Sequence, residues 1–392
     1  MTDRAATRPG PRLAPGGSAI PLRAIARALR MADARTDLER ALRARFPGRA
    51  LSFHASGREA MRVALVRLAE ARGRDEIAIP AYGCFSMPAS VVAAGLRVRL
   101  VDVDARGQLA AGAIEKLPLE RIAAIVVGNL FGLAEPIDAL ARRARAAGVA
   151  VVDDAAQALG SRDAEAPVGS RGDVGILSFG RGKPLSALGG GAAVWRAVIG
   201  SPNERTSGLE TPRPASAGLR ALAYDVSRQR FVLGLLAGIP ALGIGRTVYD
   251  PAFAQGAMDG AAVALAAALA PEVDVLGTAR RATAHALAAR IAEATAFEPL
   301  LERPGTTGVY PRLGLLAPSA SRRDRALGAL TRYGATAMYP TPMDAIRELE
   351  PHRVGDEACP GARDFCARLL TLPTHSALRG RAATVVSILS SC

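Results

Sequence analysis

The chain has 392 residues, 49% of them hydrophobic, which is enough to bury a large core and suggests two or more domains or subdomains. Its formal charge of +14 invites a nucleic-acid interpretation, but the arginines are spread singly along predicted helices and aromatic residues make up only 4%, which argues against such a partner. The four cysteines show neither CxxC spacing nor a disulfide pattern, which fits a reducing cytoplasm, and four scattered histidines argue against a bound metal.

The chain begins with a segment rich in Pro, Gly and Arg, residues 1–18, which is predicted to be a disordered leader. No apolar stretch of the kind found in signal peptides follows its basic residues. Residues 19–49 carry apolar residues at helical spacing, from Ile20 to Leu42, with Arg on the outer face. This spacing predicts one or two short helices that dock on the main body.

From residue 50 onward, short apolar runs alternate with segments of helical spacing. Strands are expected at residues 51–53, 76–80, 97–104, 122–127 and 148–152, and helices at residues 59–71, 90–95 and 137–148. This rhythm predicts a mostly parallel sheet with helices on both faces.

The strand predicted at residues 148–152 shows no polar alternation and ends in Asp153 and Asp154. Carboxylates at the carboxyl end of a parallel strand point into the crevice where α/β sheets bind ligands. The alternative role for either aspartate is to cap the N-terminus of the following helix.

Lysine occurs only at Lys116 and Lys183, so 48 of the 50 basic residues (50 − 2) are arginine. A lysine that persists in such a chain, in a loop among glycines, suits chemistry that arginine cannot perform. An ε-amine can lose its proton and form a Schiff base, whereas the guanidinium stays protonated. The alternative is a surface lysine that has not been replaced.

An aspartate and a lysine about thirty residues apart are a pair that pyridoxal phosphate can use, the lysine for its aldehyde and the aspartate for its ring nitrogen. A competing interpretation of Gly182-Lys183 as a Walker phosphate loop fails. Leu177 and Pro184 stand where that motif needs Gly and Ser or Thr.

Three blocks, in this order and spacing, resemble the DegT-type (StrS-like) sugar aminotransferases, which are fold-type-I pyridoxal phosphate enzymes. They are DAAQALG at residues 154–160, GDVGILSF at residues 172–179, and Lys183 followed by the glycines at 189–191. The resemblance implies that Lys183 carries the cofactor and that Asp154 faces the pyridine nitrogen. It also implies that Gln157 lies beside the ring and that Ser178 binds the phosphate.

The resemblance extends to two upstream turns. Gly57 and Arg58 open a predicted helix and would hold the cofactor phosphate through backbone N–H groups, although the family usually has Thr in place of Arg58. The loop after residues 76–80 would supply a side chain that stacks on the ring; the matching position is Cys84, with Phe85 or Tyr82 as substitutes. An ordinary turn and a small buried cysteine are the alternatives.

Residues 200–260 depart from the family pattern. The family's Asn-x-Arg block, which is used in binding across the dimer, is replaced here by FAQGAMD at residues 253–259. The apolar run at residues 231–245 is broken by Pro240 and is too short to span a bilayer. It is consistent with a lid, a dimer contact or a surface that touches a membrane.

The last part of the sequence predicts a smaller domain. Helices are expected at residues 260–270, 276–293 and 321–333, and strands at residues 310–316 and 335–340. The closing block at residues 358–375 again resembles the family. We therefore expect a large cofactor-binding domain over residues 50–255, followed by linking helices and a small α+β domain over residues 256–392.

The resemblance as a whole implies an α/β protein of fold type I and a homodimer. The implied activity is the transfer of an amino group, with glutamate as the usual donor, to a keto sugar linked to a nucleotide diphosphate, in amino-sugar, polysaccharide or secondary-metabolite biosynthesis. Two alternatives remain. One is a pyridoxal phosphate enzyme with other chemistry (a dehydratase) or a non-nucleotide carbonyl substrate, although Lys183 argues against the dehydratases that carry His there. The other is a non-catalytic regulatory relative, against which the four matched residues argue.

Overall fold

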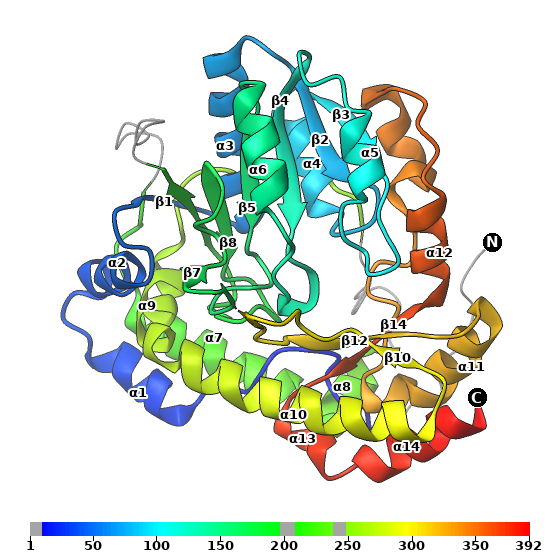
Figure 1. Cartoon of the computed structure of the whole chain (residues 1–392). Coiled ribbons are helices and arrows are strands. Elements are labelled where there is room, and N and C mark those ends of the chain that lie inside the picture. Colours follow the sequence, from blue (N-terminus) through cyan, green and yellow to red (C-terminus); the bar gives the residue numbers. More distant parts are fainter. Residues whose placement is uncertain (1–9, 197–207, 238–247) are drawn as a thin grey trace.

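An eight-stranded sheet forms the centre of the larger lobe (Figure 1) in the computed structural model, which describes residues 10–196, 208–237 and 248–392. The strand order is β1-β9-β8-β5-β4-β2-β3-β13. The pairs from β8 to β13 are parallel, whereas β9 runs antiparallel to β1 and β8, so the predicted mostly parallel sheet is confirmed and has one antiparallel edge. The strands span Ala50–His54 (β1), Glu76–Pro80 (β2), Arg97–Val101 (β3), Ile122–Gly128 (β4), Ala150–Asp154 (β5), Val174–Ser178 (β8), Gly191–Trp195 (β9) and Arg353–Val354 (β13).

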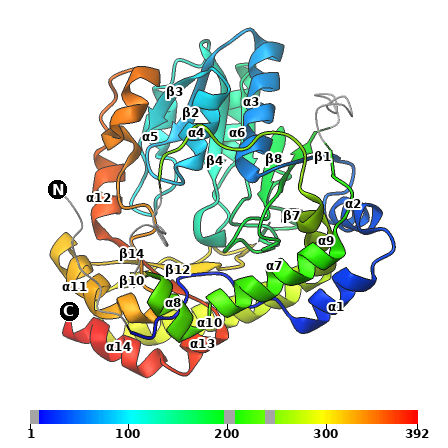
Figure 2. The same cartoon turned by 180° about the vertical axis from the view of Figure 1, so that it is seen from behind.

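Helices cover both faces of this sheet (Figures 1 and 2). In β4, Val126 packs in a core with residues of α3 and α4, while Ile125 and Val127 pack in a second core with residues of α6. A strand buried on both faces needs no polar alternation, which explains the continuous apolar runs in the sequence. The covering helices are α3 (Gly57–Arg72), α4 (Ser86–Ala93), α5 (Ala111–Glu115) and α6 (Asp138–Ala146).

Helix α3 begins at the turn that the sequence singled out. Ser56 caps the helix, because its Oγ accepts a hydrogen bond of 3.1 Å from the N–H of Glu59. The helix ends at Gly73, whose φ of 59° is the left-handed conformation that glycine adopts most easily. The start of α3 therefore lies beside the carboxyl ends of β4, β5 and β8.

A second group of helices packs beside the sheet and between the lobes. Helix α9 is buried along its whole length, and α1, α2 and α7 pack around it. By length and composition alone residues 260–294 could cross a membrane, but 72% of the apolar window is buried inside the protein, as in a core helix. The helices of this group are α1 (Leu22–Arg30), α2 (Ala34–Arg45), α7 (Pro214–Ser227), α8 (Arg230–Ala237), α9 (Gly260–Leu269) and α10 (Val273–Ala294).

The smaller lobe contains a three-stranded antiparallel sheet beside α10, in the order β10-β12-β14 (Figure 1). Strand β13 pairs with β3 and so belongs to the large sheet. The chain after residue 256 therefore contributes one short strand to the larger lobe. A short sheet joins β6 (Arg162–Asp163), β7 (Ala166–Pro167) and β11 (Thr306–Thr307). The elements of the smaller lobe are β10 (Glu298–Pro299), β12 (Arg312–Leu316), β14 (Leu369–Pro373), α11 (Ala320–Leu330), α12 (Pro360–Arg368), α13 (Ser376–Arg379) and α14 (Ala382–Ser391).

The expected strand at residues 335–340 does not form. A single bridge joins Thr336 to Thr371, and Met338 then adopts a φ of 60°, which no strand accommodates. The prolines at positions 340 and 342 also remove backbone donors that a ladder would need. The segment instead forms a loop that reaches the site.

The second half of the predicted disordered leader is packed on the protein. We call residues 12–18 the N-terminal strap. Leu13 and Ala14 are buried, the N–H of Leu13 donates to the carbonyl of Arg332 (2.9 Å), and His375 contacts the carbonyl of Ala14 (2.8 Å). The Pro- and Gly-rich composition suggested disorder, but these distant partners satisfy its backbone. Residues 1–9 lie outside the described residues, as do residues 238–245 of the apolar run, whose first part forms α8.

Candidate active site

A cavity of about 190 Å³ lies at the carboxyl ends of β4, β5 and β8. Its walls include the first turn of α3 and the loops after these strands, which is where parallel sheets bind ligands. Phe85 does not line it. The other residues predicted for the site do: Gly57, Arg58, Cys84, Asp154, Gln157, Ser178 and Lys183.

The two aspartates at the end of β5 have different surroundings. Asp153 forms a buried ion pair with Arg171 (2.8 Å) and accepts further backbone bonds from the following loop. Asp154 lines the cavity, and one of its oxygens accepts a bond of 2.9 Å from the N–H of Ala156. Burial raises the pKa of Asp154 to about 6, against the opposing effects of that N–H and of the Lys183 charge. Asp153 therefore fixes the loop at residues 169–171, while the carboxylate of Asp154 faces the cavity, where a ligand could contact it.

Lys183 lies in the loop between β8 and β9, after Gly182, whose φ of 77° turns the chain. Its side chain lines the cavity described above and also a larger one of about 890 Å³. Lys116, in contrast, is exposed at the end of α5. The scarcity of lysine in the sequence thus identified one residue at the junction of two cavities.

Gly57 and Ser178 approach so closely that a side chain at Gly57 would not fit. A Cβ added there would lie 2.7 Å from the Cβ and 3.1 Å from the Oγ of Ser178, and one added at Gly191 would collide with the backbone of Gly57. The first N–H groups of a helix have no partner within the helix. The start of α3 and the Ser178 hydroxyl therefore form a cradle rich in hydrogen-bond donors, which suits a phosphate.

The side chain of Arg58 points toward the segment that departs from the family pattern. Its guanidinium lies 5.0 Å from the centre of the Phe253 ring and 3.9 Å from the carboxylate of Asp250. The backbone of Arg58, rather than its charge, is the part positioned to serve the cradle.

Cys84 is the candidate for stacking that lines the cavity, and its thiol donates to the Ser86 hydroxyl (3.2 Å). Phe85 and Tyr82 are buried beside Tyr339, with ring centres 6.2 Å and 5.9 Å from it. Because their rings belong to this aromatic core, the expectation that Phe85 or Tyr82 could stack on a ligand is not supported by their positions.

Gln157 connects the larger lobe to the smaller one. Its side-chain oxygen accepts from the N–H of Phe131 (3.1 Å), and its amide group donates to the hydroxyl of Tyr339 (2.9 Å). Phe131 has a φ of 58°, an uncommon conformation for a residue other than glycine. Sequence reasoning gave no role to Tyr339, because only the folded chain places the loop before Pro340 beside Gln157.

Sequence reasoning also gave no site role to Asn129. Its amide donates to Asp153 (2.9 Å), and its oxygen accepts from the Arg171 guanidinium (2.7 Å) and from the N–H of Glu135 (3.1 Å). Burial raises the pKa of Glu135 to about 8. This buried network fixes the end of β5, on which Asp154 depends. The signal for Asn129 in the sequence was its position two residues after the end of the strand predicted at residues 122–127.

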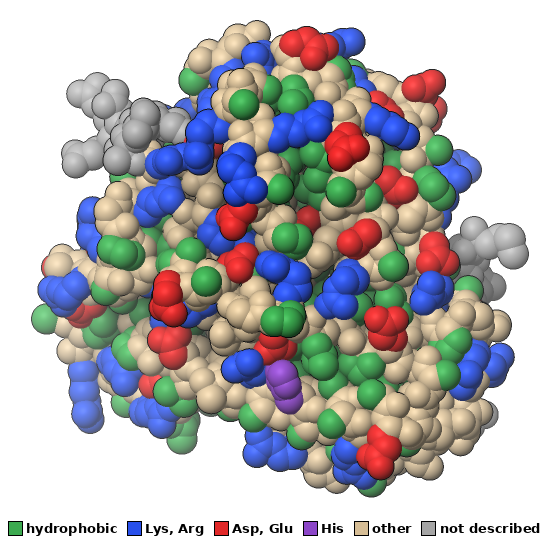
Figure 3. Space-filling model, in the orientation of Figure 1, with side chains coloured by type: hydrophobic (Ala, Val, Ile, Leu, Met, Phe, Trp, Pro, Cys, Tyr) green, Lys and Arg blue, Asp and Glu red, His purple; other side chains and the backbone are tan. Residues whose placement is uncertain are grey.

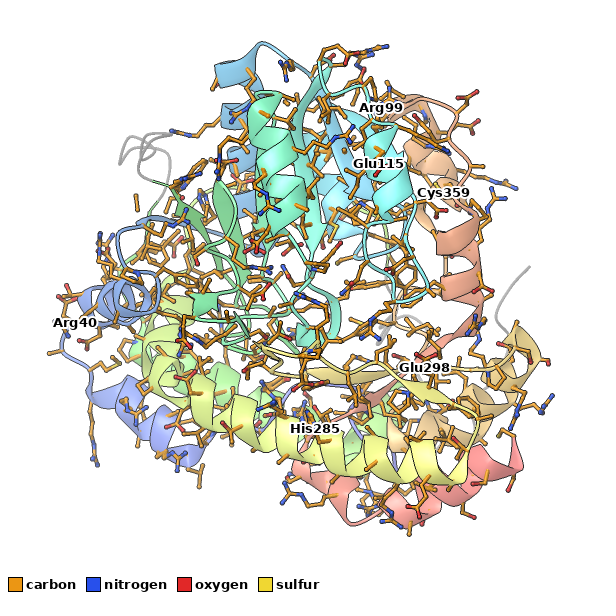
Figure 4. The ribbon with its side chains drawn as sticks, in the orientation of Figure 1. Arg40, Arg99, Glu115, His285, Glu298 and Cys359 are labelled. Atoms are coloured by element: carbon orange, nitrogen blue, oxygen red, sulfur yellow. The ribbon has the colours of Figure 1, made fainter. Side chains whose placement is uncertain are left out.

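Other titratable side chains lie away from the cavity. Burial raises the pKa of Cys359 to about 12 and of Cys366 to about 11, so these thiols pack rather than react; Cys359 precedes α12 (Figure 4). Among the described residues, no cluster of three His, Cys, Asp or Glu side chains could hold a metal ion. On the face shown in Figure 3, Lys and Arg side chains are interspersed with acidic ones rather than gathered in one patch.

Comparison with known proteins places residues 25–197 in a match to the model of the DegT/DnrJ/EryC1/StrS aminotransferase family. The chain is 34% identical over 141 residues to a UDP-N-acetyl-3-dehydro-alpha-D-glucosamine 3-aminotransferase of Acidithiobacillus ferrooxidans, a match that covers 36% of this chain and 38% of that protein. The chain thus matches little more than a third of this relative's length. The predicted resemblance is confirmed for the segment that contains the cradle, Asp154 and Lys183.

Solved structures resemble the whole fold. Helicobacter pylori PseC, an aminotransferase involved in the biosynthesis of pseudoaminic acid, superimposes with a TM-score of 0.74 at 16% identity, over 97% of this chain and 100% of that one. The PLP-form of Spr1654 from Streptococcus pneumoniae gives a TM-score of 0.72 at 18% identity, over 97% of this chain and 99% of that one. The chain therefore has the fold-type-I aminotransferase fold.

Proposed function

We propose that this chain, whose residues 25–197 match the DegT/DnrJ/EryC1/StrS aminotransferase family, is a pyridoxal-phosphate-dependent aminotransferase. Its substrates would be an amino-acid donor, glutamate, and a keto sugar carried on a nucleotide diphosphate. The observation that carries the proposal is one cavity lined by the cradle of Gly57 and Ser178, the buried carboxylate of Asp154 and the amine of Lys183.

The residues present fit this cofactor. At Gly57 the cradle has no room for a side chain, and its N–H and hydroxyl groups can donate hydrogen bonds to a phosphate. The buried carboxylate of Asp154 can pair with a positively charged ring nitrogen. When bound, pyridoxal phosphate supplies an aldehyde that bonds amines and a ring that withdraws electrons.

The side chains of the chain then have separate tasks. In its ionised form, Asp154 would hold a proton on the ring nitrogen by its charge, and burial strengthens that interaction. Lys183 would bind the cofactor and, as a neutral amine, move a proton between a carbon of the substrate and a carbon of the cofactor. Gln157, held by Phe131 and Tyr339, would limit the position of a ring beside it.

The larger cavity supports a sizeable anionic substrate. It has a volume of about 890 Å³ and opens beside Lys183 and Gln157. No Asp or Glu is among the described residues that line it, whereas five cations are: Arg181, Lys183, Arg220, Arg228 and Arg312. A diphosphate-linked sugar matches this size and charge. A homodimer, a cytoplasmic location and a role in amino-sugar, polysaccharide or secondary-metabolite biosynthesis form part of the proposal.

A non-nucleotide carbonyl substrate is the second candidate. The segment that in the family carries the Asn-x-Arg block is occupied here by Phe253, which packs against Arg58. Because the Asn-x-Arg block is replaced here, the phosphate contact that this block makes across the dimer in the family is not expected. A substrate that does not need this contact is therefore favoured.

The test is the visible absorbance spectrum of purified protein with added pyridoxal phosphate, compared with Lys183→Ala and Lys183→Arg. Lys116→Arg is the matched control, because it changes the other lysine of the chain, which is exposed. We expect a visible band in the wild type and in Lys116→Arg, and none in the Lys183 variants. The band should shift when glutamate is added.

The outcomes separate the alternatives. Absence of a band in the wild type would leave a non-catalytic relative on the same fold. A band that shifts with glutamate, followed by turnover of keto sugars without a nucleotide and not of nucleotide-linked ones, would support the second candidate.

A further inference from the structure

The N-terminal strap is anchored at both ends. Its first residues pack on the smaller lobe. At its other end, the guanidinium of Arg228 in α7 donates to the carbonyls of Gly16 (2.7 Å) and Gly17 (3.1 Å). Just after the strap, the carboxylate of Asp225 accepts bonds of 3.1 and 3.2 Å from the N–H of Ile20. A segment that is held at both ends presents a fixed surface to the residues that lie against it.

Between these anchors, the strap packs against the residue that precedes Lys183. Gly17 is buried and has a φ of 76°, a conformation that residues other than glycine seldom adopt. A Cβ added at Gly17 would lie 3.3 Å from the Cα of Gly182 and 2.7 Å from the hydroxyl of Tyr224. The strap therefore approaches the backbone of the Lys183 loop as closely as a glycine allows.

A buried arginine connects the strap to the residue that follows Lys183. Arg280 of α10 is only 4% exposed, and no acidic side chain in the described ranges pairs with it. Its Nε and Nη2 donate to the hydroxyl of Ser18 (3.2 and 2.9 Å), and its Nη1 donates to the carbonyl of Pro184 (3.3 Å). Burial lowers the pKa of Arg280 to about 10, so the group is charged near neutral pH. Because a buried charge is costly to leave unsatisfied, these two oxygens hold the strap and the loop together.

The strap also forms part of the wall of the larger cavity. Ala14, Pro15 and Gly16 line this cavity, as do Gly182 and the half-buried Lys183. Displacement of the strap would therefore open the cavity wall beside the lysine and release the loop that carries it.

We propose that Gly17, Ser18 and Arg280 are positioning residues for Lys183, because they hold its loop on both sides and so fix where its amine enters the cavity. This inference rests on the proposed function for the role of Lys183. A group that moves a proton must stay within hydrogen-bond reach of both atoms concerned. A loop that shifts by about 1 Å would slow such a step without weakening the binding of a ligand elsewhere in the cavity.

The two lysines of the chain allow a direct measurement. Full-length protein, freed of bound cofactor with hydroxylamine, is labelled with trinitrobenzenesulfonate, and the rates at Lys183 and Lys116 are followed by peptide mass spectrometry. The exposed Lys116 is the internal reference in every sample. We expect the ratio of the two rates, Lys183 over Lys116, to rise about 10-fold in Ser18→Ala and in Arg280→Gln. Loss of a hydrogen bond to a charged group shifts a local opening equilibrium by about this factor.

Three further variants show whether the effect is specific. Arg281→Gln changes the next residue of α10, whose ion pair with Glu302 (2.7 Å) involves no residue that lines either cavity, and it should label like the wild type. Ser18→Thr keeps the hydroxyl that Arg280 needs and should also label like the wild type. Gly17→Ala removes no polar group, but its Cβ would displace the strap, so the ratio should rise.

The second experiment separates positioning from binding. In cofactor-loaded Ser18→Ala, the maximal rate of the spectral change with glutamate should be about 10-fold to 100-fold lower than in the wild type. The half-saturating glutamate concentration should stay the same, and Ser18→Thr should restore the rate. A residue that only supports the fold would lower the thermal unfolding temperature and leave both kinetic constants at their wild-type values.

Three labelling results would overturn the inference. The first is a ratio that keeps its wild-type value in Ser18→Ala, Gly17→Ala and Arg280→Gln. The second is a parallel rise at Lys183 and at the reference lysine, which would indicate a general loosening of the fold. The third is an equal rise of the ratio in Arg281→Gln.

Failure of this inference can be told apart from failure of the proposed function, because the labelling uses protein without cofactor. A normal visible band together with an unchanged labelling ratio would remove only the positioning role. A missing band in the wild type would remove the proposed function. If Arg280→Gln fails to fold, Ser18→Ala and Gly17→Ala still decide, because neither removes a buried charge.

Discussion

The side-chain amide of Gln157 donates a hydrogen bond of 2.9 Å to the hydroxyl of Tyr339, and so joins a loop of the larger lobe to one of the smaller lobe, 182 residues apart. Both groups are buried. The bond lies between the two cavities, since Gln157 lines both and Tyr339 lines the larger one. It therefore couples the position of a ring beside Gln157 to the placement of the smaller lobe.

Tyr339→Phe should destabilise the protein by about 1–3 kcal/mol, because it leaves a buried amide donor of Gln157 without its partner. Urea unfolding at fixed cofactor concentration measures this loss. Tyr333→Phe is the control, because this ring lies in the short turn after α11 beside Arg332 and is not among the residues that line either cavity. Equal stabilities of the two variants would show that the bond between the lobes contributes nothing.

Asp153→Asn and Asp154→Asn should have opposite effects although the residues are adjacent. Asp153→Asn breaks a buried ion pair with Arg171 and should cost about 3–5 kcal/mol of stability. Asp154→Asn should leave the fold intact but slow the glutamate half-reaction by about 10²–10⁴-fold, the range for a group that holds a proton in the transition state. Thermal unfolding measures the stability of each variant, and the spectral change on adding glutamate measures the rate of the half-reaction. If Asp153→Asn proved to be folded but inactive, the roles assigned to the two aspartates would be reversed.

Gly57→Ala should weaken phosphate binding in the cradle. The new Cβ would lie 2.7 Å from that of Ser178, and the resulting displacement should cost about 1–3 kcal/mol. A cofactor titration followed by absorbance measures the loss. Gly112→Ala, on the outer helix α5 with open space around the glycine, should bind the cofactor like the wild type. An unchanged cofactor affinity in Gly57→Ala would show that the phosphate binds elsewhere.

Glu135→Gln should remove part of the pH dependence of stability. Burial raises the pKa of Glu135 from 4.5 to about 8, so between these values the folded protein keeps a proton that the unfolded chain has released. Stability must therefore fall as pH rises through this window, by about 1.4 kcal/mol per pH unit at most. The amide should keep the bond to the N–H of Leu109 without titrating. Urea unfolding from pH 5 to 8.5 should give a flatter profile in the variant, and parallel profiles would contradict the assignment.

Local patterns were sufficient for much of the fold. The continuous apolar run before Asp153 predicted β5, and the turn at Gly57 predicted the start of α3, because both depend on neighbours in sequence. The strand expected at residues 335–340 was wrong, because the left-handed Met338 and two prolines outweigh its apolar character. The strap was mistaken for a disordered leader, because its partners, such as Arg332 and His375, lie more than 300 residues away.

The sequence by itself determined the resemblance, the cradle, and the pairing of Asp154 with Lys183, because these residues follow strands whose carboxyl ends must meet at one edge of a parallel sheet. Only the tertiary structure showed why Asp153 does not face the cavity as well, since the loop around Arg171 occupies its carboxylate. It also brought Tyr339 and Arg312 from the smaller lobe to the cavity beside Lys183. Contacts between such distant segments carry no periodicity or spacing in the sequence, because they arise from the packing of one lobe against the other.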